Sequence, residues 1–387
     1  MSEVTLRQVI RDWLAVNYTD AVRNSTEGSE IRTAWYTKLA DKGWIAPHWP
    51  KQYGGADFNF QEHIALQQEF TSAGVIALPG YSGQGLNMIG PTLLEYGTDD
   101  QKARHLPGIA RGEVQWCQGY SEPGSGSDLA SLSTSAVLDG DHYVLNGQKI
   151  WTSGAHEADW IYVLVRTDPK AKKHDGISMV LVDINQPGVT IKPILLISGS
   201  SPFCETFFDD AIASDLIGKP NHGWTIGKRL LQHERSGIAG MGASGAAAAP
   251  TGKPHYHLAE LAKQYVGAAG GRISDAVLRD EIIQHRFNQR SLQTTLARTR
   301  AENVTGVTLG FATSIFKAVG ANQSKAETEL QVRIMGAQGT GWEGESFSPQ
   351  EIGATRNWLS RRAISIAGGT NEVQLNIIAK RVLGLPD

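Results

Sequence analysis

The sequence predicts an α+β fold in which a helical N-terminal domain, a central β domain and a helical C-terminal domain follow one another. Three observations carry this prediction. Apolar residues recur with the helical period up to about residue 115, form strand-like runs from 116 to about 220, and return to the helical period from Trp224 onward. A nicotinamide-binding fold would instead alternate strands and helices in a parallel sheet. We expect the domains to span 1–115, 116–220 and 221–387.

The first domain contains several amphipathic stretches. Similar apolar stripes occur at 32–44 and at 60–74. One helix face near the start of the chain is marked by Leu6, Val9, Ile10, Trp13 and Leu14. These patterns predict helices throughout this region.

The central domain is expected to be a β-barrel or a sandwich. Runs rich in β-branched residues, each bounded by Gly, Pro or Asp, occur at 159–168, 176–184 and 188–194. At 142–151, two short runs flank Asn146-Gly147, a pair typical of a two-residue hairpin turn. We therefore expect a hairpin at this pair.

The third domain is expected to be helical to the end of the chain, with one interruption. The stretch GMGASGAAAAPTGKP, residues 240–254, is rich in Gly, Ala and Pro and predicts a mobile loop.

Composition excludes several classes of function. A net charge of −3 gives no reason to expect a nucleic-acid partner, and the two cysteines form neither a disulfide framework nor a metal site. No apolar run approaches the ~20 residues that cross a bilayer, and the first residues lack a signal-peptide pattern. We expect a cytoplasmic protein that binds no membrane.

Two local motifs suggest chemistry. The loop YSEPGSGSDLAS, residues 120–131, offers hydroxyl and backbone N–H groups that suit a polar ligand such as a pyrophosphate, although it could also be a plain turn. In LLQHERSGIAG, residues 230–240, helical spacing places Glu234 on the same face as Leu230 and Ile238. The alternative for the second motif is a solvated Glu234–Arg235 pair on a misjudged helix.

Six separated stretches occur in an order that resembles one enzyme family. They are LLEYGTDDQKARHLPGIARGE, WCQGYSEPGSGSDLASLSTSA, LNGQKIWTSGAHEADW, FFDDAIASDLIGKPNHGW, HERSGIAG and the stretch from IMGAQGTG to AISIAGGTNEVQLNIIAKRVLGLP. Across nearly the whole chain the sequence resembles an acyl-CoA dehydrogenase, a flavoenzyme that oxidises the Cα–Cβ bond of acyl-CoA thioesters. The resemblance implies a helical domain, a β-barrel and a four-helix C-terminal domain.

The resemblance also implies FAD as the cofactor. Ser127 would contact the FAD pyrophosphate or the neighbouring CoA. Ser121 would offer its hydroxyl to the flavin ring. The positions that match the family's flavin contacts are Tyr120, Ser121, Trp151, Ser153 and Thr370.

One position departs from the family's catalytic pattern. In the family, a base takes the α-proton, flavin N5 takes the β-hydride, and the thioester oxygen is held partly by the backbone N–H of the residue before a Gly-Thr pair. That residue is usually the catalytic glutamate, but here it is Gly368. Glycine keeps the N–H donor and cannot take a proton, so either the chain is inactive or its base lies elsewhere.

Some branches of the family take the base from a Glu-Arg pair on the helix after the β domain. Glu234 occupies that position, and a desolvated glutamate has the raised pKa that suits a base near neutral pH. Arg235 would brace this helix beside the substrate. Glu372 is the competing base, although the family uses its position for flavin or structural contacts.

The residues that the family uses to bind the adenine end of FAD are replaced in this sequence. The family's Arg-x-x-Phe-Gly segment is missing from YVGAAGGRISDAVLRD, which leaves Arg272 as a weak substitute. Arg333 replaces the usual glutamine before the loop that contains Gly336 and Gly339. Such departures are expected of branches built from two unlike subunits, often acting on steroid-type acyl-CoAs.

The resemblance therefore implies an acyl-CoA substrate, an electron-transfer flavoprotein as electron acceptor, and assembly with itself or with an unlike dehydrogenase subunit. Two alternatives remain. The chain could be a non-catalytic subunit that shares an FAD site, or a flavin oxidase or monooxygenase on the same fold.

Overall fold

The computed structural model describes residues 3–76, 82–238, 258–304 and 313–386, without the side chains of 234–238 and 300–304. The chain forms two compact units. The first contains 1–194 and 202–249, and the second contains 195–201 and 250–387. The loop predicted at 240–254 lies outside the described residues.

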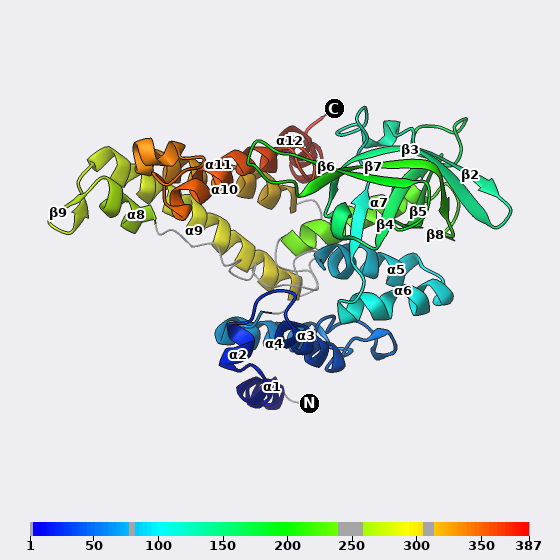
Figure 1. The fold of residues 1–387 in the computed structure, drawn as a ribbon, viewed down its shortest axis with the longest axis horizontal. Coiled ribbons are helices and arrows are strands. Elements are labelled where there is room, and N and C mark those ends of the chain that lie inside the picture. Colours follow the sequence, from blue (N-terminus) through cyan, green and yellow to red (C-terminus); the bar gives the residue numbers. More distant parts are fainter. Residues whose placement is uncertain (1–2, 77–81, 239–257, 305–312, 387) are drawn as a thin grey trace. The chain divides into compact units, whose positions relative to one another are not determined.

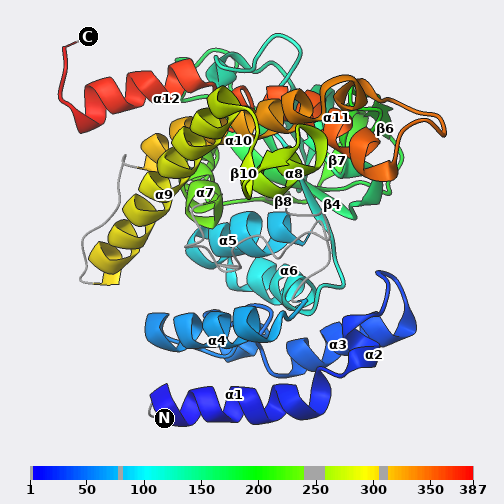
Figure 2. The same ribbon diagram turned by 90° about the vertical axis from the view of Figure 1, so that its left-hand side faces the viewer.

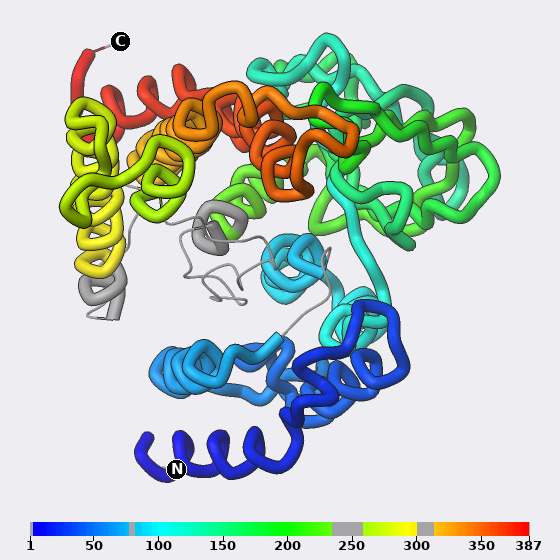
Figure 3. Tube along the Cα trace, turned by 60° about the vertical axis from the view of Figure 1, so that its left-hand side comes forward, coloured from blue at the N-terminus to red at the C-terminus, as the bar shows by residue number. Residues whose placement is uncertain are grey.

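Helices form the N-terminal part of the first unit, as predicted. α1 and α4 lie side by side (Figure 2), and the chain passes from α6 into β1 (Figure 3). The main helices are α1 (Glu3–Asn17), α2 (Asp20–Arg23), α3 (Glu30–Asp41), α4 (Phe60–Ala73), α5 (Gly90–Tyr96) and α6 (Asp99–Arg111). Their apolar faces meet in one core, where Ile10, Leu39 and Leu66 are almost completely buried.

The central β domain is one eight-stranded sheet in the order β6-β7-β3-β2-β4-β5-β8, with β1 parallel to β4 (Figure 1). Its strands are β1 (Trp116–Gly119), β2 (Ser135–Asp139), β3 (His142–Ser153), β4 (Trp160–Arg166), β5 (Ile177–Asp183), β6 (Val189–Ile194), β7 (Phe203–Ala213) and β8 (Asp215–Leu216). α7 (Gly223–Ile238) packs against β4 and β5. The expected β domain is confirmed.

The hairpin predicted at Asn146-Gly147 is wrong. β3 runs through this pair as one strand, and the turn lies earlier, at Gly140 (φ +62°), between β2 and β3. Gly147 (φ +147°) instead marks a shift in the β3–β7 register, and a Cβ there would lie 2.7 Å from Thr134 Cα. Close packing therefore explains this glycine, and the Asp-Gly pair that precedes Asp141 supplies the turn.

The second unit is helical and is organised around α10 (Thr313–Met335). α8 (Leu258–Tyr265), α9 (Ala276–Val304), α11 (Pro349–Arg361) and α12 (Asn371–Ile377) all contact α10. Leu330, Ile334 and Met335 of α10 share a core with Leu258 and Leu261 of α8. The expected helical C-terminal domain is confirmed.

Candidate functional site

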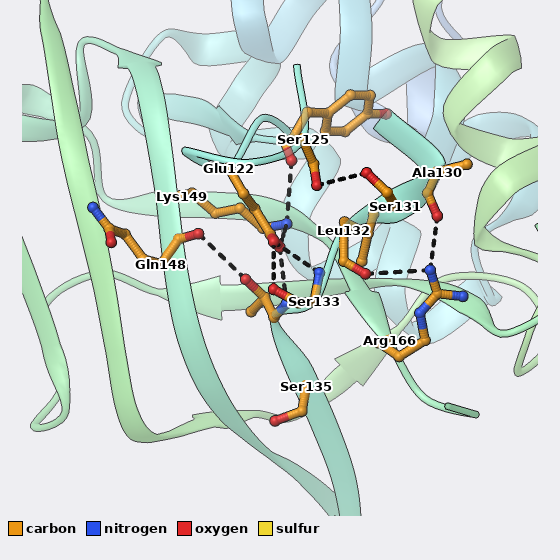
Figure 4. Close-up of polar contacts among 12 residues, drawn as sticks. Glu122, Ser125, Ala130, Ser131, Leu132, Ser133, Ser135, Gln148, Lys149 and Arg166 are labelled. Atoms are coloured by element: carbon orange, nitrogen blue, oxygen red, sulfur yellow. Dashed lines mark hydrogen bonds and ion pairs between the residues drawn. The ribbon is translucent and has the colours of Figure 1, made fainter. Parts of the chain in front are cut away.

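A buried ion pair organises the serine- and glycine-rich loop that follows β1. Lys149 is fully buried in β3, and its Nζ donates to Glu122 Oε1 at 2.8 Å and to the Tyr120 carbonyl at 3.1 Å (Figure 4). The Glu122 carboxylate also accepts bonds from the backbone N–H groups of Ser133 (2.7 Å) and Thr134 (2.8 Å). The pair of Glu122 with Lys149 thus ties the start of the loop to β3 and to the segment at 133–134.

The charge of Glu122 is strongly favoured in the folded state. Burial acts to raise its pKa, but the Lys149 charge and the hydrogen bonds from Lys149, Thr134 and Ser133 outweigh burial and lower the pKa to about 2. A buried charge with this many partners is stable, because each lone pair that loses water gains a donor.

The far end of the loop is held by a second cation. Arg166 Nη2 donates to the carbonyls of Ala130 (2.8 Å) and Leu132 (3.2 Å), and the hydroxyls of Ser125 and Ser131 lie 2.9 Å apart (Figure 4). Because these contacts use backbone carbonyls, they fix the path of the loop. Ser127 lies between the two anchors and is exposed.

Trp151 combines a left-handed backbone conformation with an exposed aromatic side chain. Its φ is +62°, a conformation that costs energy for any residue with a Cβ, and its side chain is 53% exposed. The β3–β7 register shifts between Lys149 and Thr152, so the strand turns Lys149 inward and Trp151 outward. The ring of Trp151 meets Phe203 edge-on, with centroids 6.3 Å apart. These facts oppose the alternative that Trp151 is a core residue of the β domain.

Tyr120 lies where β1, β4 and α7 come together. Its buried ring meets Tyr162 edge-on, with centroids 6.1 Å apart. A Cβ on Gly227 of α7 would lie 3.4 Å from Tyr120 Oη. Since the backbone N–H of Ile150 donates to the Ser121 carbonyl at 2.9 Å, the Tyr120–Ser121 segment also lies against the strand that carries Trp151.

Glu234 and Arg235 lie on α7, but their side chains are outside the described part of the structure. The buried positions of α7 include Ile226, Gly227 and Leu230. In a regular helix, position 234 is two turns after 227 and one turn after 230, so it shares their face.

The C-terminal motif combines two glycines in left-handed conformations with a helix cap. Gly368 has φ +65° and Gly369 has φ +85°. The Thr370 hydroxyl accepts the N–H of Val373 at 3.2 Å and so caps α12. Glu372 is exposed in the first turn of that helix, and hydrogen bonds from its own backbone N–H and from Thr370 lower its pKa.

Of the two arginines expected to bind the adenine end of FAD, one forms an ion pair within the protein and the other is exposed to solvent. Arg333 pairs with Glu281 on α9, with Nη2 2.9 Å from Oε2, and Arg272 lies exposed on β10 (Arg272–Ile273) of a small hairpin. Gly336 has φ +57°. At Gly339 a Cβ would come within 2.3 Å of the Val332 carbonyl oxygen, which explains this glycine by packing.

The structure thus brings Tyr120, Ser121, Trp151 and Ser153 together on adjoining segments of one sheet, with Ser127 on the loop beside them. Sequence reasoning missed the residues that hold this arrangement, Glu122, Lys149 and Arg166. The available signal was a lysine inside an otherwise strand-like run at 148–152 and an acid directly after Ser121. Within the described side chains, no group of three or more His, Cys, Asp or Glu could hold a metal ion.

Comparison with known proteins gives the chain its family. Models of the N-terminal, middle and C-terminal domains of acyl-CoA dehydrogenases match residues 2–113, 117–211 and 221–383. The acyl-CoA dehydrogenase IpdE1 of Mycolicibacterium smegmatis is 36% identical over 401 residues, covering 98% of this chain and 97% of its own length. The chain belongs to the acyl-CoA dehydrogenase family.

Solved acyl-CoA dehydrogenases share its fold. The Tcur3481–Tcur3483 steroid ACAD is 29% identical with a TM-score of 0.75, covering 99% of this dehydrogenase and 96% of that chain. The ChsE4–ChsE5 complex from Mycobacterium tuberculosis is also 29% identical with a TM-score of 0.75, covering 100% and 98%. Among the described helices of this dehydrogenase, none is long and apolar enough to cross a membrane.

Acyl-CoA dehydrogenases are FAD-dependent oxidoreductases, and the residues of this dehydrogenase fit that cofactor. The exposed indole of Trp151, held in a costly backbone conformation, and the buried Tyr120 ring offer apolar surfaces to a flavin. The anchored loop at 120–131 carries backbone N–H groups and serine hydroxyls, donors of the kind that suit a pyrophosphate.

The Glu122 carboxylate predicts an acid-dependent stability. Because its pKa falls from 4.5 to about 2 on folding, its stabilising effect is full above about pH 5 and is lost as the pH falls toward 2. We expect the urea midpoint of the β domain, followed by tryptophan fluorescence, to fall over this range in the wild type. Glu122→Gln should lower the midpoint at pH 7 and flatten its pH dependence below pH 5. An equally steep acid dependence in that variant would contradict the assignment.

Proposed function

We propose that this dehydrogenase converts an acyl-CoA thioester to the trans-2-enoyl-CoA with Glu234 as the base, and passes electrons to an electron-transfer flavoprotein. The assignment of Glu234 as the base rests on where α7 runs relative to the proposed flavin site. Gly227 lies against Tyr120, one of the residues assigned to the flavin, and position 234 lies two turns further along the same face. A carboxylate there is suitably placed to meet the α-carbon of a bound thioester.

The competing carboxylate is less suited to this reaction. Glu372 is exposed and its pKa is lowered by its hydrogen bonds, whereas a base that acts near neutral pH benefits from a raised pKa. Gly368 has no carboxylate to offer, although its N–H can still donate to the thioester oxygen as negative charge develops. FAD, when bound, supplies the acceptor for the hydride that leaves Cβ.

The remaining site residues have positioning roles in this proposal. Glu122, Lys149 and Arg166 hold the loop so that Ser121 and Ser127 can donate to the cofactor. Lys149 does this directly, because its ammonium group binds the Tyr120 carbonyl. Trp151 and Tyr120 would exclude water from the flavin surface, which strengthens electrostatic contacts there.

We further propose an unlike dehydrogenase subunit as the partner and a steroid-type acyl-CoA as the substrate. Support comes from the similar structures of a steroid ACAD and of the complex of ChsE4 with ChsE5. Apolar side chains on α9 also favour a protein partner, since Val277, Ile283 and Phe287 are 70%, 42% and 64% exposed.

A second function is favoured by two observations. Gly368 lacks the family's usual carboxylate, and Arg333 is paired with Glu281, which is what a non-catalytic subunit with a shared FAD site would also show.

A panel of acyl-CoAs separates the two functions. We expect the purified full-length protein, alone or coexpressed with a partner subunit, to be yellow and to reduce an electron-accepting dye with at least one short, long, branched or steroid-type acyl-CoA. A colourless protein that is inactive with every thioester in both preparations would favour the non-catalytic subunit. Rapid oxygen consumption without dye would argue for an oxidase instead.

A further inference from the structure

Three histidines of the first unit form a cluster close to the proposed base. His63 lies on α4, His48 lies in the segment between α3 and α4, and His233 is the residue directly before Glu234 on α7. We call these three residues the histidine cluster. Two of them therefore come from the N-terminal helical domain and the third from the helix that carries the base.

The cluster is held by specific contacts. The rings of His48 and His63 meet edge-on with centroids 5.6 Å apart, and His63 Nε2 lies 2.7 Å from Gln67 Nε2. His233 Nε2 lies 3.2 Å from Glu95 Oε1, and the same oxygen accepts Arg229 Nη2 at 2.7 Å. Arg229 therefore shares the Glu95 charge with His233.

Two members of the cluster, His48 and His233, favour the uncharged imidazole. Burial, followed by the repulsion of His63 and His233, lowers the pKa of His48 to about 4. Burial also lowers the pKa of His233, against the attraction of Glu95. A neutral imidazole has one N–H donor and one acceptor nitrogen, so it suits an uncharged oxygen group.

Of the three histidines in the cluster, His48 is the one that is accessible to a ligand. His63 is buried and His233 is partly buried. His48 is surrounded by enough protein to disfavour its charged form, but it keeps exposed surface, so it is the member of the cluster that can meet a ligand. An imidazole against a purely aliphatic group would lose its hydrogen bonds to water without replacement. A carboxylate would call for a protonated imidazole, which the neighbouring rings oppose.

We propose that the histidine cluster recognises a ketone or hydroxyl oxygen on the acyl part of the substrate, with His48 as the contacting residue. This inference rests on the proposed function, because it takes Glu234 to mark where the reacting carbons bind. His233 adjoins that residue in the sequence, so an acyl group that extends from the α-carbon past α7 toward α4 would meet His48. The cluster then determines specificity and takes no part in proton transfer.

Two thioesters that differ in one oxygen test this role. We compare 3-(4-oxocyclohexyl)propanoyl-CoA with 3-cyclohexylpropanoyl-CoA, using the FAD-loaded full-length enzyme. The wild type should prefer the ketone by about tenfold in kcat/KM, the effect of one hydrogen bond. His48→Leu should remove this preference mainly by raising KM for the ketone, and His48→Asn, which keeps a donor and an acceptor, should restore part of it.

A control variant and a binding measurement complete the test. His142→Leu removes an imidazole from the β2–β3 hairpin and should leave the preference unchanged. Calorimetric titration with the two enoyl-CoA products should show the same preference and the same loss in His48→Leu. A wild type that turns over both thioesters without preference, or a His48→Leu variant that loses both equally, overturns the proposal while leaving the dehydrogenase function intact. Failure with every acyl-CoA would instead overturn the proposed function and this inference with it.

Discussion

Glu234→Gln is expected to lower acyl-CoA-dependent reduction of the flavin by about 10²–10⁴-fold, the usual contribution of a general base. The amide has nearly the same size as the carboxylate but cannot accept the α-proton. Stopped-flow absorbance at the flavin band measures the loss in a single turnover, independently of the electron acceptor. The visible spectrum before substrate addition should be unchanged, because none of the contacts assigned to FAD involves this side chain.

Glu372→Gln is the matched control for this variant. Its carboxylate is exposed and has a lowered pKa, so we expect flavin reduction to change by less than about threefold, well below the effect of losing a base. The opposite pattern, with Glu234→Gln active and Glu372→Gln inactive, would move the base to α12.

Lys149→Met is expected to lower the free energy of unfolding of the β domain by about 3–5 kcal/mol, because it leaves the Glu122 carboxylate buried without its partner. The same change removes the donor to the Tyr120 carbonyl, so FAD should also be retained less well. The urea midpoint and the ratio of flavin to protein after gel filtration measure the two effects.

The exposed pair of Lys173 with Asp128 offers a matched comparison. Both side chains are at least half exposed, so Lys173→Met should cost less than about 1 kcal/mol. The double variant Glu122→Gln/Lys149→Met should recover part of the lost stability, since no charge then remains buried. Equal losses in Lys149→Met and Lys173→Met would contradict the role given to the buried pair.

Local sequence patterns were sufficient for the order of the domains. Helical stripes such as the one through Leu6, Ile10 and Leu14 depend on neighbours within two turns, and these residues are indeed buried in α1. The Asn146-Gly147 pair shows where this reasoning fails. Its preference for a turn is local, but the sheet extends β3 through it because Gly147 can pack against Thr134 and Asn146 binds Asp210.

The candidate site also has features that the sequence indicated and features that only the structure shows. The sequence motifs named Tyr120, Ser121, Trp151 and Ser153, and the missing carboxylate at Gly368 directed attention to Glu234. The motifs did not indicate that Trp151 adopts a left-handed conformation, or that Lys149 points inward to hold the loop through Glu122. Both follow from a register shift between β3 and β7, strands about 50 residues apart in the sequence.

The sequence by itself determined the family and the order of the domains, and it supplied the candidate residues for the chemistry, because each depends on residue type and short spacing. Only the tertiary structure decided which of these residues meet. It placed Gly227 of α7 against Tyr120 and brought His48 to His63. The physical reason is that burial, charge and strain arise from contacts between distant segments, which no local pattern records.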